Sequence, residues 1–112
     1  MKFGYAGGMI TNDPILIRFR KALDALYGDR IDRVVLYGSR ARGDARDDSD
    51  YDVALFLKGE TNMWDEHKLI HPIVWAIFEE TGADISTFAF PARSWEQRTP
   101  LMHEIRKDGL TL

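Results

Sequence analysis

The sequence predicts a single α/β or α+β domain built around one sheet. Segments with helical hydrophobic spacing alternate with short apolar runs of strand type, and Gly, Pro and Asn residues separate them. A chain of 112 residues is long enough for one hydrophobic core and too short for two. We therefore expect one domain over 1–112, with the order helix, strand, short helix, strand, helix, strand, helix.

Composition excludes several classes of protein. The chain has no cysteine, so it has neither disulfides nor thiolate metal sites. Its net charge of −3 gives no overall basic field, and we expect no direct binding to nucleic acid. Its longest apolar run is far too short to cross a membrane. We expect a cytoplasmic protein without membrane contact.

The amino-terminal third begins with a segment that has no helical periodicity. Residues 1–11 are rich in glycine and aromatic residues, and we expect an irregular arm or a short edge strand that could serve self-association. Asn12, Asp13 and Pro14 then form a helix start, and Gly28 is a suitable stop. The apolar stripe of this helix comprises Ile15, Phe19, Leu23, Leu26 and Tyr27.

Three strands and two further helices follow. The apolar runs predict strands over 32–37, 50–57 and 83–90. Helical spacing covers 64–81, where Pro72 predicts a kink or two abutting helices near His71. Ser94 and Gln97 form a weak capping box, and a final helix starts at Thr99-Pro100. That helix ends at Gly109, which leaves 110–112 as a tail or an edge strand.

The most informative stretch is residues 38–52, GSRARGDARDDSDYD. Gly38 and Ser39 follow a strand, and Asp50 and Asp52 open the next one. Alternate strand residues point to the same face, so both carboxylates leave the sheet side by side and repel unless a cation lies between them. Mg²⁺ is usually held by one or two carboxylates together with substrate phosphates. A tight turn with exposed amides offers a place for phosphate, so the stretch suggests a metal–nucleotide site.

Other interpretations of this stretch fit less well. Walker A spacing between Gly38 and Gly43 is followed by Asp-Ala where Lys and Ser or Thr are required. Arg40 occupies the middle glycine of a dinucleotide fingerprint, and an EF-hand would need a central Gly and a terminal Glu. A solvated, charged turn between two strands remains the plain alternative.

Two other groups of residues lie outside this stretch. Lys68 and Pro72 argue against a zinc site at His67 and His71. The three tryptophans suit a core or an interface: Trp64, Trp75 and Trp95.

The joint pattern resembles the minimal nucleotidyltransferases of the polymerase-β-like superfamily. Gly38-Ser39, a ten-residue spacer and Asp50-Tyr51-Asp52 are similar to the signature of that family, most strongly over 33–57 and more weakly to the chain end. The resemblance implies a small mixed sheet with helices packed mainly on one face. It also implies that Asp50 and Asp52 hold Mg²⁺, with two ions expected, and that Gly38 and Ser39 bind the β- and γ-phosphates of ATP.

Three further site residues are expected on the same resemblance. Arg40 and Arg42 suit phosphate contacts, and the alternative for them is pairing with Asp44, Asp47 or Asp48. Active members of the family carry a third carboxylate on the next strand, for which Asp84 is the best match. Its alternative role is a residue that opens the strand after Gly82.

The resemblance implies transfer of AMP from ATP onto an acceptor hydroxyl. Chains of this type are often paired with a HEPN-domain toxin, and the expected acceptor is a tyrosine of that partner, which makes the chain an antitoxin. Two alternatives stay open. One is a nucleotide-binding antitoxin that acts by contact alone, and the other is transfer to a small molecule such as an aminoglycoside.

Overall fold

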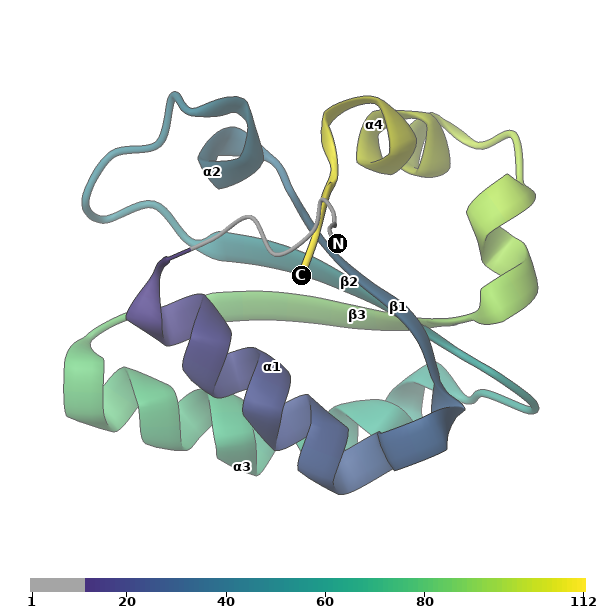
Figure 1. Ribbon diagram of the computed structural model, residues 1–112, viewed down its shortest axis with the longest axis horizontal. Coiled ribbons are helices and arrows are strands. Elements are labelled where there is room, and N and C mark those ends of the chain that lie inside the picture. Colours follow the sequence, from purple (N-terminus) through teal and green to yellow (C-terminus); the bar gives the residue numbers. More distant parts are fainter. Residues whose placement is uncertain (1–11) are drawn as a thin grey trace.

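The computed structural model describes residues 12–112, so the arm expected over 1–11 lies outside the described residues. Within these described residues, four strands form one mixed sheet in the order β3-β2-β1-β4 (Figure 1). The strands are β1 (Ile31–Tyr37), β2 (Tyr51–Leu57), β3 (Ile85–Pro91) and β4 (Leu110–Thr111). β1 pairs antiparallel with β2 and β4, whereas β2 pairs parallel with β3. The predicted single mixed sheet is confirmed.

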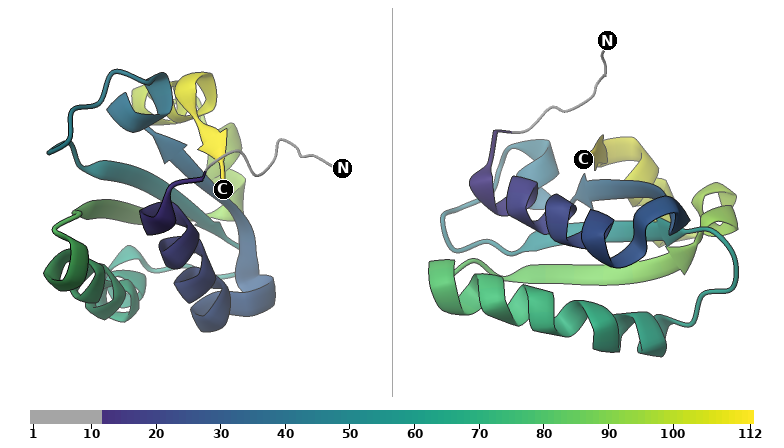
Figure 2. Two further views of the ribbon diagram at one scale, coloured as in Figure 1. Left: turned by 60° about the vertical axis from the view of Figure 1, so that its left-hand side comes forward. Right: turned by 60° about the horizontal axis from the view of Figure 1, so that its bottom comes forward.

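The two faces of the sheet bury two hydrophobic clusters, because alternate strand residues point to opposite sides. The two long helices, α1 (Pro14–Tyr27) and α3 (Met63–Thr81), cover one face (Figures 1 and 2). The shorter helix α4 (Pro100–Asp108) and the 3₁₀ turn η2 (Ala92–Glu96) lie against the other. The first cluster includes Phe19, Leu23, Val34, Val53, Leu55, Ile70 and Ile77, and the second includes Val35, Ala54, Phe56, Met102 and Ile105.

The helix starts follow the predicted caps. Asp13 Oδ1 accepts a hydrogen bond from the N–H of Ile15 at 2.8 Å, and Thr99 Oγ1 accepts one from Met102 at 3.1 Å. These side chains satisfy N–H groups that have no partner within the helix. α1 continues directly into a 3₁₀ turn, η1 (Gly28–Arg30). The helix predicted to start at Asn12-Asp13-Pro14 and the helix predicted to start at Thr99-Pro100 are both confirmed.

Two local predictions need correction. α3 runs unbroken through Pro72, so the alternative of two abutting helices is wrong, whereas the alternative of a kink stays a prediction. Pro72 and Lys68 are exposed, so the carbonyl that loses its N–H partner four residues before the proline can bind water. Ser94 and Gln97 do not form a capping box. Ser94 is buried in η2, and its carbonyl oxygen accepts the N–H of Gln97 at 3.1 Å.

The topology brings three chain segments to one end of the sheet. Because β1 and β2 are antiparallel, the end of β1 lies beside the start of β2, with Tyr37 opposite Asp52. Because β2 and β3 are parallel, the start of β3 lies at the same end, with Ser86 opposite Asp52.

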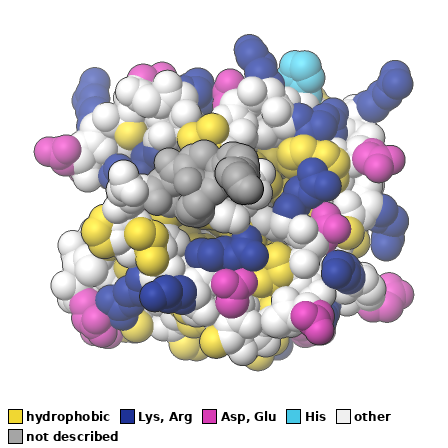
Figure 3. All heavy atoms as spheres, in the orientation of Figure 1, with side chains coloured by type: hydrophobic (Ala, Val, Ile, Leu, Met, Phe, Trp, Pro, Cys, Tyr) yellow, Lys and Arg dark blue, Asp and Glu magenta, His cyan; other side chains and the backbone are white. Residues whose placement is uncertain are grey.

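The face in Figure 3 carries interspersed acidic and basic side chains. No helix within residues 12–112 combines the length and apolarity that a membrane span needs.

Candidate functional site

The turn after β1 is built around a glycine that lies against a carboxylate. Gly38 has φ 74° and ψ −157°, a conformation that is essentially restricted to glycine. A Cβ added to Gly38 would collide with Oδ2 of Asp52. The absence of a side chain therefore lets the chain turn while the Asp52 carboxylate rests against its backbone.

The short helix α2 (Ser39–Arg42) starts at this glycine. Its first N–H groups, those of Ser39 and Arg40, have no acceptor four residues earlier in the helix. Gly43 ends the helix in the left-handed conformation, and its N–H donates to the carbonyl of Ser39 at 3.0 Å. Tyr37 pairs with Asp52 across the two strands. Gly38 and Ser39, which follow Tyr37 and are expected to bind phosphate, therefore lie next to Asp52.

The two acids that open β2 lack polar partners. Asp50 is exposed, Asp52 is half-buried, and neither carboxylate accepts a hydrogen bond within residues 12–112. Burial raises the pKa of Asp52 above its ordinary value, and the charges of Asp50 and Glu104 raise it further, whereas Arg42 opposes the shift. Two unpaired carboxylates, one of them partly desolvated, fit a hard cation such as Mg²⁺ whose other ligands are phosphate and water oxygens.

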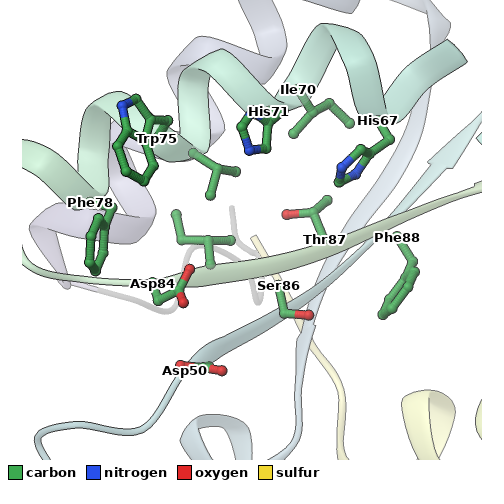
Figure 4. A pocket seen from close by; sticks show the side chains of 12 residues that line it. Asp50, His67, Ile70, His71, Trp75, Phe78, Asp84, Ser86, Thr87 and Phe88 are labelled. Atoms are coloured by element: carbon green, nitrogen blue, oxygen red, sulfur yellow. The ribbon is translucent and has the colours of Figure 1, made fainter. Parts of the chain in front are cut away.

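Asp84 lies next to Asp50 at the start of β3. Its carbonyl oxygen accepts the N–H of Tyr51 at 2.9 Å, which continues the parallel ladder back to these two acids. Both acids line a cavity of about 500 Å³ beside β3 (Figure 4). Ser86, and not Asp84, is the residue opposite Asp52. Over the described part of the chain, no three Asp, Glu, His or Cys side chains are grouped so as to hold a metal ion.

Arg40 holds the loop between α2 and β2. Its Nε and Nη2 donate to the carbonyl of Ser49 at 3.0 and 2.8 Å, and Nη2 also contacts the carbonyls of Arg46 and Asp47. The guanidinium stacks over the ring of Tyr51, 4.0 Å from its centroid. These contacts are with loop carbonyls and not with the side chains of Asp44, Asp47 or Asp48, and the phosphate contact expected of Arg40 stays a prediction.

Arg42 forms ion pairs with acidic side chains of the loop and of α4. It pairs with Asp44 at 3.3 Å and lies 3.7 Å from Asp108 at the end of α4. The side chain is 40% exposed, so these ion pairs are weak and the guanidinium is available to a phosphate. Asp47 and Asp48, the other predicted partners, form no ion pair with it among the described residues.

Glu104 is a neighbour that motif spacing did not single out. It lies on α4, and its charge raises the pKa of both Asp52 and Tyr37. More than fifty residues separate Glu104 from Asp52 in the chain, and only the packing of α4 on the sheet brings them together. The site therefore has a more negative potential than its sequence motif alone indicates.

Comparison with known proteins agrees with this geometry. A family model described as nucleotidyltransferase domain matches residues 16–100. A predicted protein adenylyltransferase of Methanocaldococcus jannaschii is 38% identical over 56 residues, which is 50% of this chain and 57% of that protein. The match thus spans little more than half the length of this relative.

Solved structures share the fold at low sequence identity. A predicted nucleotidyltransferase from Sulfolobus solfataricus superposes with a TM-score of 0.64 at 19% identity, over 87% of this chain and 75% of that one. A toxin–antitoxin structure with AMP-PNP gives 0.61 at 15% identity, over 90% and 72%. A mutant of the toxin–antitoxin MntA-HpeT gives 0.58 at 13% identity, over 83% and 70%.

The family model spans most of the chain, and the Gly-Ser turn and the paired acids of its motif meet at one end of the mixed sheet. The chain belongs to the nucleotidyltransferase domain family and has the minimal polymerase-β-like fold.

Proposed function

We propose that this chain is a Mg²⁺-dependent adenylyltransferase that moves AMP from ATP onto a tyrosine hydroxyl of a co-encoded HEPN-domain toxin, and so acts as its antitoxin. The observation that carries the proposal is the contact between the Gly38 turn and the Asp52 carboxylate. It puts backbone amides that would bind phosphate beside an acid that would hold a cation. The protein adenylyltransferase relative supports a protein as the acceptor, and the toxin–antitoxin structures support a toxin as the partner.

Each group of the site has a place in the reaction. The amides of Gly38 and Ser39 would bind the β- and γ-phosphates, and Arg42 would contact the pyrophosphate. Asp50 and Asp52 would hold Mg²⁺, with Asp84 completing the set for a second ion. When bound, the metal supplies charge neutralisation on the triphosphate.

The transfer itself exchanges one phosphorus–oxygen bond for another. The acceptor oxygen bonds to the α-phosphorus, the bond from that phosphorus to the oxygen bridging to the β-phosphate breaks, and pyrophosphate leaves with its electron pair. The acceptor proton must leave as the new bond forms, and we assign Asp84 as its acceptor because this exposed carboxylate shares a cavity with Asp50.

Labelled ATP tests this proposal. The protein is incubated with Mg²⁺, ATP labelled at the α-phosphate and the co-encoded HEPN protein, and label on the HEPN protein is measured. Asp50→Ala and Asp52→Ala should each abolish transfer. Asp48→Ala is the matched control, since this acid lies in the same exposed loop without a hydrogen bond or ion pair among the described residues, and it should transfer normally.

A contact-only antitoxin is the second candidate function. The observation that favours it is that no three metal-binding side chains are grouped within residues 12–112. Neutralisation of the toxin that survives both Asp50→Ala and Asp52→Ala would establish this alternative and overturn the enzymatic one.

A further inference from the structure

An exposed aromatic stripe runs along α3 and plays no part in the core. Trp64, His67, His71, Trp75 and Phe78 are three or four residues apart and therefore share one helix face. Three of the four neighbouring pairs of rings are in contact, with centroids 6.3 Å apart for Trp64 and His67, and 5.7 Å apart for both His67–His71 and Trp75–Phe78. Trp64 is 74% exposed and Trp75 is 51% exposed, so large aromatic surfaces face solvent.

This stripe forms one wall of a groove along β3. The cavity that reaches Asp50 and a second cavity of about 230 Å³ share His67, Ile70, Thr87 and Phe88. Figure 4 shows Thr87 directed toward α3, whereas Ser86 points toward the opposite side of the strand. A cavity lined by residues of both faces must pass around the edge of the strand. We call this hollow the β3 groove.

The edge of β3 in this groove has unpaired backbone groups. Among the described strands, β3 pairs only with β2. The Asp84 carbonyl points toward β2, so the backbone groups of Ser86 and Phe88 also do, and those of Ile85, Thr87 and Ala89 point outward. Pro91, which has no N–H, falls in the outward set as expected for an edge strand.

A buried hydroxyl in the same groove also lacks a partner. Thr87 Oγ1 is buried and has no hydrogen-bond partner among residues 12–112. Buried polar groups are nearly always paired with protein or with water, and a segment bound along β3 would be one source of a partner for this hydroxyl. Thr87 therefore offers an outward N–H and C=O to the groove, and its buried hydroxyl belongs to a residue that lines it.

The lining chemistry favours a polypeptide over a nucleic acid. Neither cavity is lined by Lys or Arg, and the end nearest the site carries Asp50 and Asp84, so phosphates would find no counter-charge there. A row of outward N–H and C=O groups is complementary to another backbone in extended conformation. The aromatic wall suits apolar side chains of such a segment.

We propose that the β3 groove binds an extended segment of the acceptor protein, which pairs with the open edge of β3 and packs on the aromatic stripe of α3. This inference rests on the proposed function, since the groove ends at Asp50 and Asp84 and the bound segment would present its hydroxyl side chain there. The groove thus selects the acceptor, while the Gly38 turn binds the nucleotide.

Variants of the groove test this with the HEPN protein as the probe. Binding to that protein is measured by calorimetry without ATP, and transfer is measured with ATP-Mg²⁺. Trp75→Ala and Phe78→Ala should each weaken binding by about tenfold or more, as aromatic anchors do. Leu69→Ala is the matched control, because this exposed leucine of α3 lines neither cavity. It should bind like the wild type.

Two substitutions at Thr87 separate the backbone edge from the hydroxyl. Thr87→Pro removes the outward N–H and leaves the β2 ladder intact, so it should abolish measurable binding. Thr87→Val removes only the hydroxyl and should weaken binding several-fold. If Thr87→Pro does not fold, hydrogen exchange on the wild type replaces it: the amides of Thr87 and Ala89 should exchange more slowly with the HEPN protein bound.

The outcomes distinguish this inference from the proposed function. Unchanged binding in the aromatic variants, with normal transfer, overturns the groove and leaves the enzyme intact. Groove-dependent binding without any transfer overturns the enzyme and supports the groove. A wild type that does not bind the HEPN protein contradicts both. Sedimentation showing a dimer that Thr87→Pro dissociates would mean that a second copy occupies the edge, which also overturns the inference.

Discussion

Replacement of Gly38 by alanine probes the contact on which the site is built. The residue has φ 74° and ψ −157°, a region of backbone conformation that costs a residue with a side chain about 1–3 kcal/mol. At roughly 4 °C per kcal/mol for a domain of this size, Gly38→Ala should lower Tm by about 4–12 °C.

The same methyl group acts on catalysis through Asp52. The added Cβ would meet Oδ2 of Asp52, so the carboxylate must move by on the order of 1 Å to restore van der Waals separation. A displacement of about 1 Å at a catalytic group can cost on the order of 100-fold in rate. We therefore expect Gly38→Ala to lose about 100-fold in transfer even where it remains folded.

Gly59→Ala is the control that separates the two effects. Gly59 also has a positive φ, 80°, but a Cβ there would meet nothing within 4 Å. This variant should lose stability by about 1–2 kcal/mol and keep its transfer rate. Thermal denaturation and labelled-ATP transfer are measured on both variants below their Tm. Equal transfer by Gly38→Ala and Gly59→Ala would refute the role given to the Gly38–Asp52 contact.

Three further predictions concern groups around the site. The pKa of the Asp52 carboxyl is raised in the folded state, so the folded protein binds the carboxyl proton more tightly than the unfolded chain does. The free energy of unfolding therefore falls as pH rises from about 4 through the raised pKa. Asp52→Asn should abolish this loss and raise Tm at pH 7, and a lower Tm would contradict the prediction. Glu66→Ala should cost about 1–3 kcal/mol in urea unfolding, because the buried hydroxyl of Tyr27 loses its 2.8 Å acceptor, and an unchanged midpoint would argue against this pair. Arg40→Lys should speed proteolysis of loop 43–50, because an ammonium group cannot donate the two parallel hydrogen bonds that the guanidinium gives the Ser49 carbonyl. Unchanged cleavage would show that the loop does not depend on Arg40.

The local part of the site could be predicted from the sequence. Gly38, Ser39, Asp50 and Asp52 lie at the ends of two consecutive strands joined by a short connection, so antiparallel pairing alone brings them together. The periodicity of the apolar residues also predicts where both long helices and three strands begin and end to within two residues. These features depend on neighbours that are close in the chain.

Features that depend on distant contacts could not be predicted in this way. Glu104 reaches Asp52 only through the packing of α4. Arg40 binds carbonyl groups of the loop, and carbonyl positions leave no trace in residue types. Pro72 is tolerated within α3 because its side of the helix is exposed, which its sequence neighbours do not show. Trp64 is 74% exposed and so lies outside the core, while its expected place in an interface stays a prediction.

The position of the label in ATP tests the central claim most directly. The wild type and Asp52→Ala are each incubated with Mg²⁺ and the HEPN protein, once with ATP labelled at the α-phosphate and once with ATP labelled at the γ-phosphate. The account predicts that only the α-label reaches the HEPN protein, that the γ-label leaves in pyrophosphate, and that Asp52→Ala transfers neither. Transfer of the γ-label, or α-label transfer that survives Asp52→Ala, would contradict it.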